Sequence, residues 1–174
     1  MSAGLERRSL VRFVAGFALA FGLLELGYLY VALGSAPYQG YLETLARLTF
    51  FVAGALGYDV EWSGTFVLAD EGVIEIVPGC DALQPMMLFG AGILAWPSSW
   101  LRRLVALGAG LAVLFALNLV RLATLFVIQV EAPERFDLAH MSVWPVILIV
   151  STTALWFVCL ARMPVAEPAR PVDS

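Results

Sequence analysis

Three residues of this chain combine a reactive side chain with an unusual setting: Cys80, Arg121 and the single histidine, His140. Cys80 follows Pro78-Gly79 and precedes Asp81-Ala82-Leu83, a pattern that predicts a helix beginning at Cys80 or Asp81. The positive end of a helix dipole favours the thiolate form of a nearby thiol, and the thiolate is the nucleophile. The alternative is that Cys80 is a small apolar residue that fills space in a core.

Arg121 lies within a long apolar run, one helical turn after Asn118. A charged residue inside a membrane helix is costly, so by default it indicates a functional site. The alternative is a structural ion pair with Glu25, which lies in the first apolar run. The two roles are compatible, because Glu25 would orient the Arg121 guanidinium while the guanidinium also contacts a substrate. Asn118 is of the type that forms hydrogen bonds between membrane helices.

His140 is a candidate general base or acid if it lies opposite a cysteine. Asp137, three residues earlier, would either orient the His140 ring or cap the last helix, and we favour the cap. The second cysteine, Cys159, is predicted to pack against the other helices or to face lipid. The sequence has no ligand set for a structural metal, and we expect no cofactor.

The composition places these residues in a membrane protein. The 174 residues are 61% hydrophobic and 14% charged, whereas soluble domains have about 45–50% apolar and about 25% charged residues. This excludes a soluble globular domain and a disordered chain. The ten basic residues are all arginine, and the net charge is −4, so the chain offers no basic surface for nucleic acid.

Four apolar runs, at residues 10–33, 81–96, 101–130 and 140–160, are long enough to span a bilayer. Seven of the ten arginines lie in three segments that are cytoplasmic if both ends of the chain are inside. These are Arg7, Arg8 and Arg12, then Arg102 and Arg103, then Arg162 and Arg170. The first run is predicted to be a retained anchor, and residues 34–80 are predicted to lie outside.

Two weaker segments lie within that outer region. Residues 41–57 are predicted to form an interfacial or re-entrant helix. Residues 59–77 are rich in β-branched and aromatic residues around Ala69-Asp70-Glu71-Gly72, which predicts a β-hairpin. The predicted fold is an all-α integral membrane protein with about four transmembrane helices, an interfacial helix and a small extracytoplasmic hairpin. It comprises one domain, residues 1–162, and a disordered tail, residues 163–174.

This topology brings three residues that are distant in sequence to one depth near the outer face. Cys80 lies at the outer end of its span, His140 at the outer start of the last span, and Arg121 about two turns below the outer end of its helix. Arg121 is not among the seven arginines that fix the orientation. The convergence is the strongest indication of a functional site in the sequence.

Three blocks of this sequence resemble the signature blocks of exosortases and archaeosortases: Pro78-Gly79-Cys80-Asp81-Ala82-Leu83, Asn118-Leu119-Val120-Arg121-Leu122 and Ala139-His140. The resemblance covers about residues 41–160. The short single-module length is most similar to exosortase H or the related M-type proteins. The chain has Asp81-Ala82 where many members have a small residue followed by glycine.

The resemblance implies a membrane-embedded cysteine transpeptidase in the bacterial cytoplasmic membrane, with its active site facing the extracytoplasmic side. Cys80 would be the nucleophile, Arg121 the stabiliser of the oxyanion or substrate carbonyl, and His140 the proton shuttle. Asn118, Glu25, Asp81 and Asp137 are the substrate-binding or supporting candidates.

The implied substrates are secreted proteins that end in a short motif, an apolar span and a basic cluster. The implied acceptor is a membrane lipid or glycan component, and an H-type enzyme would recognise a motif of the IPTL type. Two other readings remain open. One is an intramembrane cysteine protease that uses water as acceptor, and the other is a non-catalytic polytopic protein with a structural Glu25–Arg121 pair.

Overall fold

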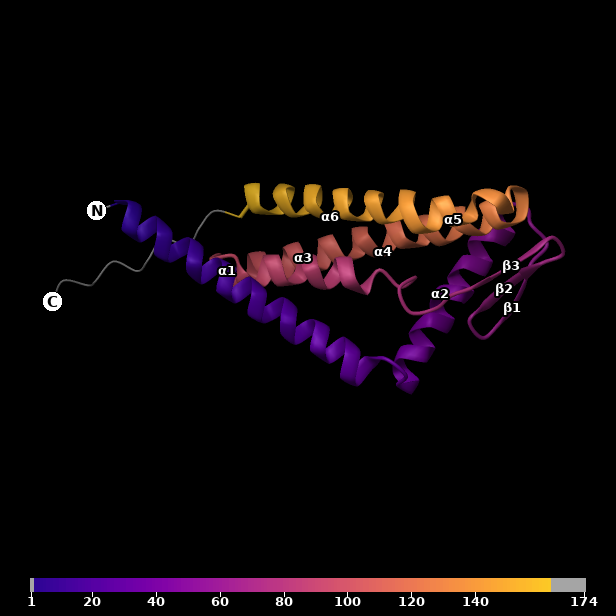
Figure 1. The fold of residues 1–174 in the computed structure, drawn as a ribbon, viewed down its shortest axis with the longest axis horizontal. Coiled ribbons are helices and arrows are strands. Elements are labelled where there is room, and N and C mark those ends of the chain that lie inside the picture. The colour runs from indigo at the N-terminus through magenta and orange to yellow at the C-terminus, as the bar shows by residue number, and fades with distance from the viewer. Residues whose placement is uncertain (1, 164–174) are drawn as a thin grey trace.

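The computed structural model describes residues 2–163, so the predicted tail lies outside the described residues apart from Met163. Helices α1 (Ser2–Gly27), α3 (Leu83–Ala95), α4 (Trp100–Glu131) and α6 (Trp144–Ala161) form the bundle. Helices α3, α4 and α6 pack side by side, and α1 packs on α3 and then diverges from the bundle (Figure 1). The start of α1, the α3–α4 connection and the end of α6 lie at the same end of the molecule.

Three helical segments among the described residues are long and apolar enough to cross a membrane: Leu10–Tyr30, Trp100–Glu131 and Pro133–Ala161. The last is a continuous helical path through a 3-10 turn (Pro133–Arg135), α5 (Phe136–Leu138), a π-helical turn (Ala139–Val143) and α6. The 13-residue helix α3 extends about 20 Å, less than the ~30 Å hydrocarbon core. The chain is therefore a membrane protein with three full-length candidate spans and one shorter apolar helix, where the sequence predicts four spans.

Close contacts fix α3 between its two neighbours. A Cβ added to Gly92 would lie 2.5 Å from Nε1 of Trp156 on α6, and one added to Gly110 on α4 would overlap the Phe89 ring of α3. Small residues at such contacts let membrane helices approach closely. Outside these contacts, the bundle exposes large apolar side chains such as Leu19 and Phe157, as a surface in contact with lipid requires.

Helix α2 (Ala36–Ala55) crosses the other end of the bundle at a steep angle to α4 (Figure 1). It begins sharply because the Ser35 hydroxyl accepts a hydrogen bond from Tyr38 N at 3.4 Å and Pro37 occupies the first turn. A π-helical turn (Tyr28–Ala32) extends α1 toward this start. The end of α1 therefore lies close to the start of α2.

The segment after α2 folds as a three-stranded antiparallel sheet of order β1-β2-β3: β1 (Glu61–Ser63), β2 (Phe66–Ala69) and β3 (Gly72–Glu75). The sequence predicts only two strands here. The third strand exists because a second turn, with Gly64 at φ +59°, lets β1 pair with β2. Val67, Ile74 and Ile76 pack in one core cluster with residues of α2 and α4.

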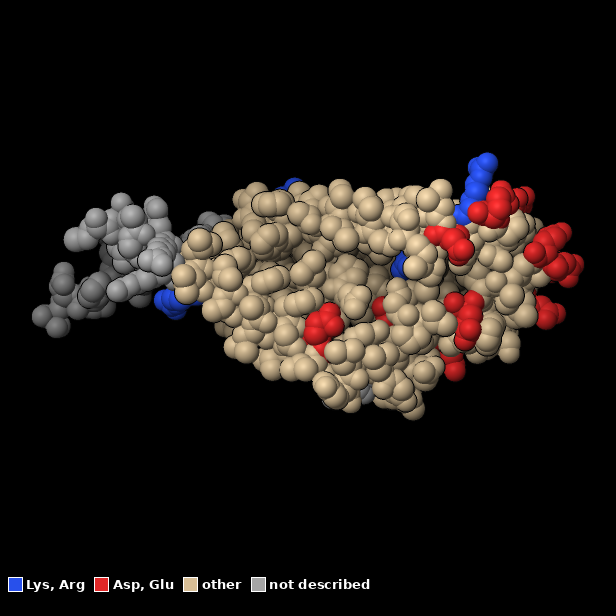
Figure 2. Space-filling model, in the orientation of Figure 1, with Lys and Arg blue, Asp and Glu red and all other residues tan. Residues whose placement is uncertain are grey.

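Acidic side chains gather at the sheet end of the molecule, over the strands and α5 (Figure 2). The sheet segment carries Glu61, Asp70, Glu71 and Glu75. The two ends of the bundle thus differ in charge, because four of the arginines used to predict the orientation, Arg12, Arg102, Arg103 and Arg162, belong to the opposite end.

Candidate active site

Cys80 lies in the turn that leads from β3 into α3. Gly79 has φ +94°, and Cys80 N donates a hydrogen bond to Val77 O at 2.9 Å. The prediction that a helix begins at Cys80 or Asp81 is wrong, because Ala82 adopts the left-handed conformation (φ 55°) and α3 begins at Leu83. Cys80 therefore precedes the helix, and its thiol does not lie at the helix N-terminus where the dipole is predicted to favour the thiolate.

The structure brings Cys80 and His140 into contact. Their Sγ and Nε2 atoms are 3.8 Å apart, although the residues are 60 positions apart in the sequence. Cys80 is buried, and His140 is half-buried in the π-helical turn, with its ring against Phe136. Single π-helical turns are frequent at functional sites. A thiol and an imidazole in this geometry can exchange a proton, which activates the sulfur as a nucleophile.

Two polar residues of α4 hold the backbone of the cysteine loop, residues 79–81. Asn118 Nδ2 donates to Cys80 O at 3.0 Å, and Arg121 Nη1 donates to Gly79 O at 3.3 Å. Both side chains are buried, and Asn118 Oδ1 and Arg121 Nε have no hydrogen-bond partner within the described residues. Since the guanidinium has five N–H donors, Arg121 retains capacity for another acceptor.

The opposite side of the loop is held by tyrosines that the sequence analysis missed. Asp81 is 1% exposed, and its Oδ2 accepts hydrogen bonds from Tyr38 at 2.5 Å and from Tyr28 at 3.3 Å. The two hydroxyls are 3.1 Å apart, and Tyr41 donates to Asp81 O at 3.0 Å. Asp81 Oδ1 accepts from Leu83 N at 3.0 Å. This cluster of Tyr28, Tyr38, Tyr41 and Asp81 is called the tyrosine–aspartate cluster below.

The tyrosine hydroxyls act as donors in this cluster. Burial, followed by the charge of Asp81, raises the pKa of Tyr41 to about 12. Burial and the hydrogen bond to Asp81 also raise the pKa of Tyr38. Both hydroxyls therefore keep their protons at neutral pH. The signal that the sequence offered was the spacing of Tyr38 and Tyr41, which puts them on one face of α2.

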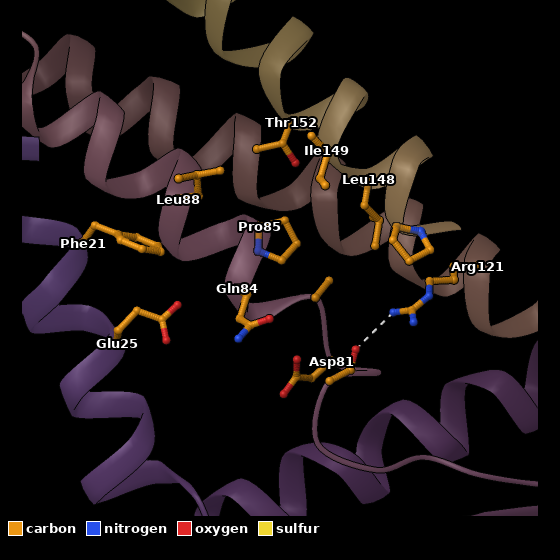
Figure 3. A pocket seen from close by; sticks show the side chains of 13 residues that line it. Phe21, Glu25, Asp81, Gln84, Pro85, Leu88, Arg121, Leu148, Ile149 and Thr152 are labelled. Atoms are coloured by element: carbon orange, nitrogen blue, oxygen red, sulfur yellow. Dashed lines mark hydrogen bonds between the residues drawn. The ribbon is translucent and has the colours of Figure 1, made fainter. Parts of the chain in front are cut away.

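Glu25 and Arg121 do not form the ion pair that the structural alternative requires. They line the same cavity of about 460 Å³, with Glu25 on α1 and Arg121 on the far side beyond Gln84 and Asp81 (Figure 3). Among the residues whose side chains the structure describes, 10–30 and 33–163, an ion pair instead joins Arg135 and Glu134 at 3.6 Å. The pairing fails because Glu25 lies near the end of α1, the part that diverges from the bundle, and it faces Arg121 only across the cavity.

Asp137 is not a helix cap. It lies inside α5, its side chain is exposed, and the N-terminal residues of α5 and α6 have no side-chain cap hydrogen bond. The helical path begins earlier, at Pro133, because proline is favoured in a first helical turn.

The cysteine loop separates two cavities. Gly79 and Asp81 line the cavity that contains Glu25 and Arg121. Cys80 and His140 line a second cavity of about 310 Å³, together with residues 73–77 and the C-terminal half of α4. The thiol–imidazole pair and the Arg121 guanidinium thus line different cavities, although Arg121 also bonds the loop at Gly79 O.

A buried cysteine in contact with a histidine, within a bundle of apolar helices, defines a candidate thiol enzyme of the membrane. The family model described as transmembrane exosortase (Exosortase_EpsH) matches residues 5–158. This chain therefore belongs to the transmembrane exosortase family, which confirms the resemblance of its three sequence blocks to that family. Membership implies, in general terms, a processing enzyme of the cysteine type. No curated protein and no solved structure matches the chain.

Proposed function

We propose that this protein is a membrane-embedded cysteine transpeptidase. It cleaves the C-terminal sorting tails of secreted proteins and transfers the remaining protein to a lipid or glycan acceptor. The observation that carries the proposal is the 3.8 Å contact between Cys80 Sγ and His140 Nε2, in a chain that belongs to the exosortase family.

In the first half-reaction, His140 Nε2 takes the thiol proton and the Cys80 sulfur attacks a peptide carbonyl carbon. A C–S bond forms, and the carbonyl oxygen becomes a tetrahedral oxyanion. The C–N bond then breaks, His140 gives its proton to the leaving amine, and a thioester remains on Cys80. The tail leaves with its new amino terminus.

In the second half-reaction, a hydroxyl or amine of the acceptor loses a proton to His140 and attacks the thioester carbonyl. The C–S bond breaks and the proton returns to the Cys80 sulfur. Water in place of the acceptor gives hydrolysis by the same residues, so the mass of the product distinguishes transfer from proteolysis.

Arg121 has two roles in this proposal. Its bond to Gly79 O holds the loop, and its remaining donors stabilise the oxyanion or the substrate carbonyl. A preorganised cation in a site of low dielectric constant is effective there, and arginine cannot lose its proton. Asn118 fixes the Cys80 carbonyl and so positions the nucleophile.

We further propose that the site faces the extracytoplasmic side of the bacterial inner membrane. The arginines at one end of the bundle and the acidic side chains at the other support this orientation. A substrate held by its own apolar span would then present its motif at the depth of Cys80.

The test compares Cys80→Ala with Cys159→Ala in cells that express a secreted protein with a matching tail. Cys159 contacts the cluster at the opposite end of the bundle, so Cys159→Ala is the matched control. We expect Cys80→Ala to abolish processing on a gel while membrane levels stay normal, and Cys159→Ala to process the substrate. Normal processing by a well-expressed Cys80→Ala protein would instead favour a non-catalytic role.

A further inference from the structure

The cavity beside Cys80 runs along one strand of the sheet. Five consecutive residues, Val73 to Val77, line it on one side. Residues of α4 with Phe136 and His140 line the other side. Side chains of consecutive strand residues point to opposite faces. Residues from both faces of the strand line the cavity, so the cavity follows the edge of β3 rather than one face of the sheet.

The edge of β3 has unused backbone hydrogen-bonding groups. The strand order leaves β3 at the border of the sheet. Ile76 N donates to Thr65 O at 2.9 Å, so Ile74 and Ile76 direct their backbone groups toward β2. By the alternation of an antiparallel ladder, Val73, Glu75 and Val77 direct theirs toward the cavity. Val77 O is used by Cys80 N, and no hydrogen bond within residues 2–163 is found for the other groups of this edge.

Two of the side chains along this edge are also exposed. Val73 is 49% exposed and Val77 is 37% exposed. Native proteins usually guard exposed edges with lysine, proline or a covering segment, because an open edge pairs with other strands. Here Glu75 is the one charged residue among the five, and the groove continues to Cys80 and His140.

We propose that the edge of β3 binds the recognition segment of a protein substrate as an added β-strand, with the scissile carbonyl directed to Cys80. The occupant is an extended, mainly apolar peptide segment that immediately precedes the substrate's membrane span. This inference rests on the transpeptidase function proposed above. It adds the site and the conformation in which the segment is recognised.

The dimensions and chemistry of the groove fit such a segment. The five residues Val73 to Val77, of which the first three belong to β3, extend over roughly 13–17 Å if they are fully extended, the length of a motif of four or five residues. In β-strand addition, backbone hydrogen bonds supply affinity and pockets for alternate side chains supply specificity. Leu122, Leu125 and Phe136 provide apolar walls for those side chains. The groove is closed at Gly72, where an added Cβ would lie 3.3 Å from Gln129 O of α4.

The first test uses disulfide cross-linking in a protein that lacks both native cysteines, Cys80→Ala with Cys159→Ala. Val73→Cys is combined with a substrate that carries a single cysteine, moved one position at a time through its motif. We expect cross-links at alternate motif positions, because side chains of paired strands meet on the same face. Trp62→Cys, at the other edge of the sheet, is the control and should give no such pattern. Cross-links without alternation, or equally strong ones from Trp62→Cys, would overturn the proposal.

The second test measures processing by Glu75→Pro and Glu75→Ala in the otherwise native protein. Proline removes an N–H that faces the groove without removing a bond of the β2–β3 ladder. We expect KM for Glu75→Pro to exceed that for Glu75→Ala by roughly three- to tenfold, the effect of one hydrogen bond, at equal membrane levels. Equal KM values would contradict strand addition. The transpeptidase proposal would stand in that case, since its own test is the activity of Cys80→Ala.

Discussion

The loop that carries Cys80 is held by two different sets of residues. From one side, α4 and the π-helical turn before α6 supply nitrogen groups: Asn118 and Arg121 bind loop carbonyls, and His140 contacts the thiol. From the other side, the π-helical turn after α1 and helix α2 supply tyrosine hydroxyls that bind Asp81. The nitrogen groups touch or adjoin the reacting atoms, whereas the tyrosine–aspartate cluster touches only the loop. We therefore expect changes on the first side to lower the rate, and changes on the second side to lower stability.

His140→Ala is expected to have the largest effect among these variants. Loss of the proton shuttle should slow processing by roughly 10²–10⁴-fold, and it should leave a residual rate because the thiol remains. Processed and full-length substrate on a gel, normalised to enzyme in the membrane, gives the measurement. A His140→Ala enzyme that works at the wild-type rate would remove the histidine from the mechanism.

Arg121→Lys should fail nearly as badly as Arg121→Ala, with a loss of about 10²–10³-fold for a lost oxyanion donor. Lysine keeps a charge but lacks the planar fork, and it can lose its proton when desolvated. Arg135→Lys is the matched control, because the Arg135 side chain is 76% exposed. If Arg121→Lys processes substrate nearly as fast as the wild type, Arg121 supplies only charge and the oxyanion role is wrong.

Tyr38→Phe changes the tyrosine–aspartate cluster and should therefore lower stability more than rate. It leaves the buried Asp81 without its shortest hydrogen bond, at a cost of about 1–3 kcal/mol. We expect a lower melting temperature in detergent and less protein in the membrane, with the rate per folded molecule reduced much less. Tyr30→Phe is the control, since Tyr30 is 83% exposed. A large loss of rate with unchanged stability would give the cluster a direct part in catalysis.

The smallest expected effect belongs to Ala82→Gly. Ala82 has φ 55°, a left-handed conformation that costs an ordinary residue about 1–2 kcal/mol and glycine almost nothing. The variant should be more stable than the wild type by about 1 kcal/mol, with processing retained. A thermal shift in detergent measures this, and a less stable variant would show that the Ala82 methyl contributes more through packing than its backbone costs.

The sequence predicted the helices of the bundle and the meeting of Cys80 with His140 because both leave strong signals. Apolar runs specify membrane helices, and Asn118 and Arg121 are conspicuous inside such a run. The tyrosine–aspartate cluster left only a weak signal, the spacing of Tyr38 and Tyr41, since tyrosine is ordinary in a half-apolar helix. Its role depends on Asp81, which lies 43 residues from Tyr38 in the sequence.

The errors share a physical cause, which is that local patterns do not determine backbone conformation or helix divergence. Helix α3 begins at Leu83, later than predicted, because Ala82 has a left-handed backbone conformation. The helix propensity of alanine gives no indication of this conformation. Glu25 and Arg121 were paired by depth alone, but the divergence of α1 separates them across a cavity. β1 was missed because its pairing depends on the turn at Gly64.

The most direct test of the central claim is to trap the acyl-enzyme. Purified protein is incubated with a substrate that carries the sorting tail, without acceptor, and its intact mass is measured. We expect an adduct equal to the substrate without its tail, released by hydroxylamine as a thioester should be and absent from the Cys80→Ala protein. An adduct that resists hydroxylamine, or that forms equally on Cys80→Ala, would contradict thioester formation at Cys80.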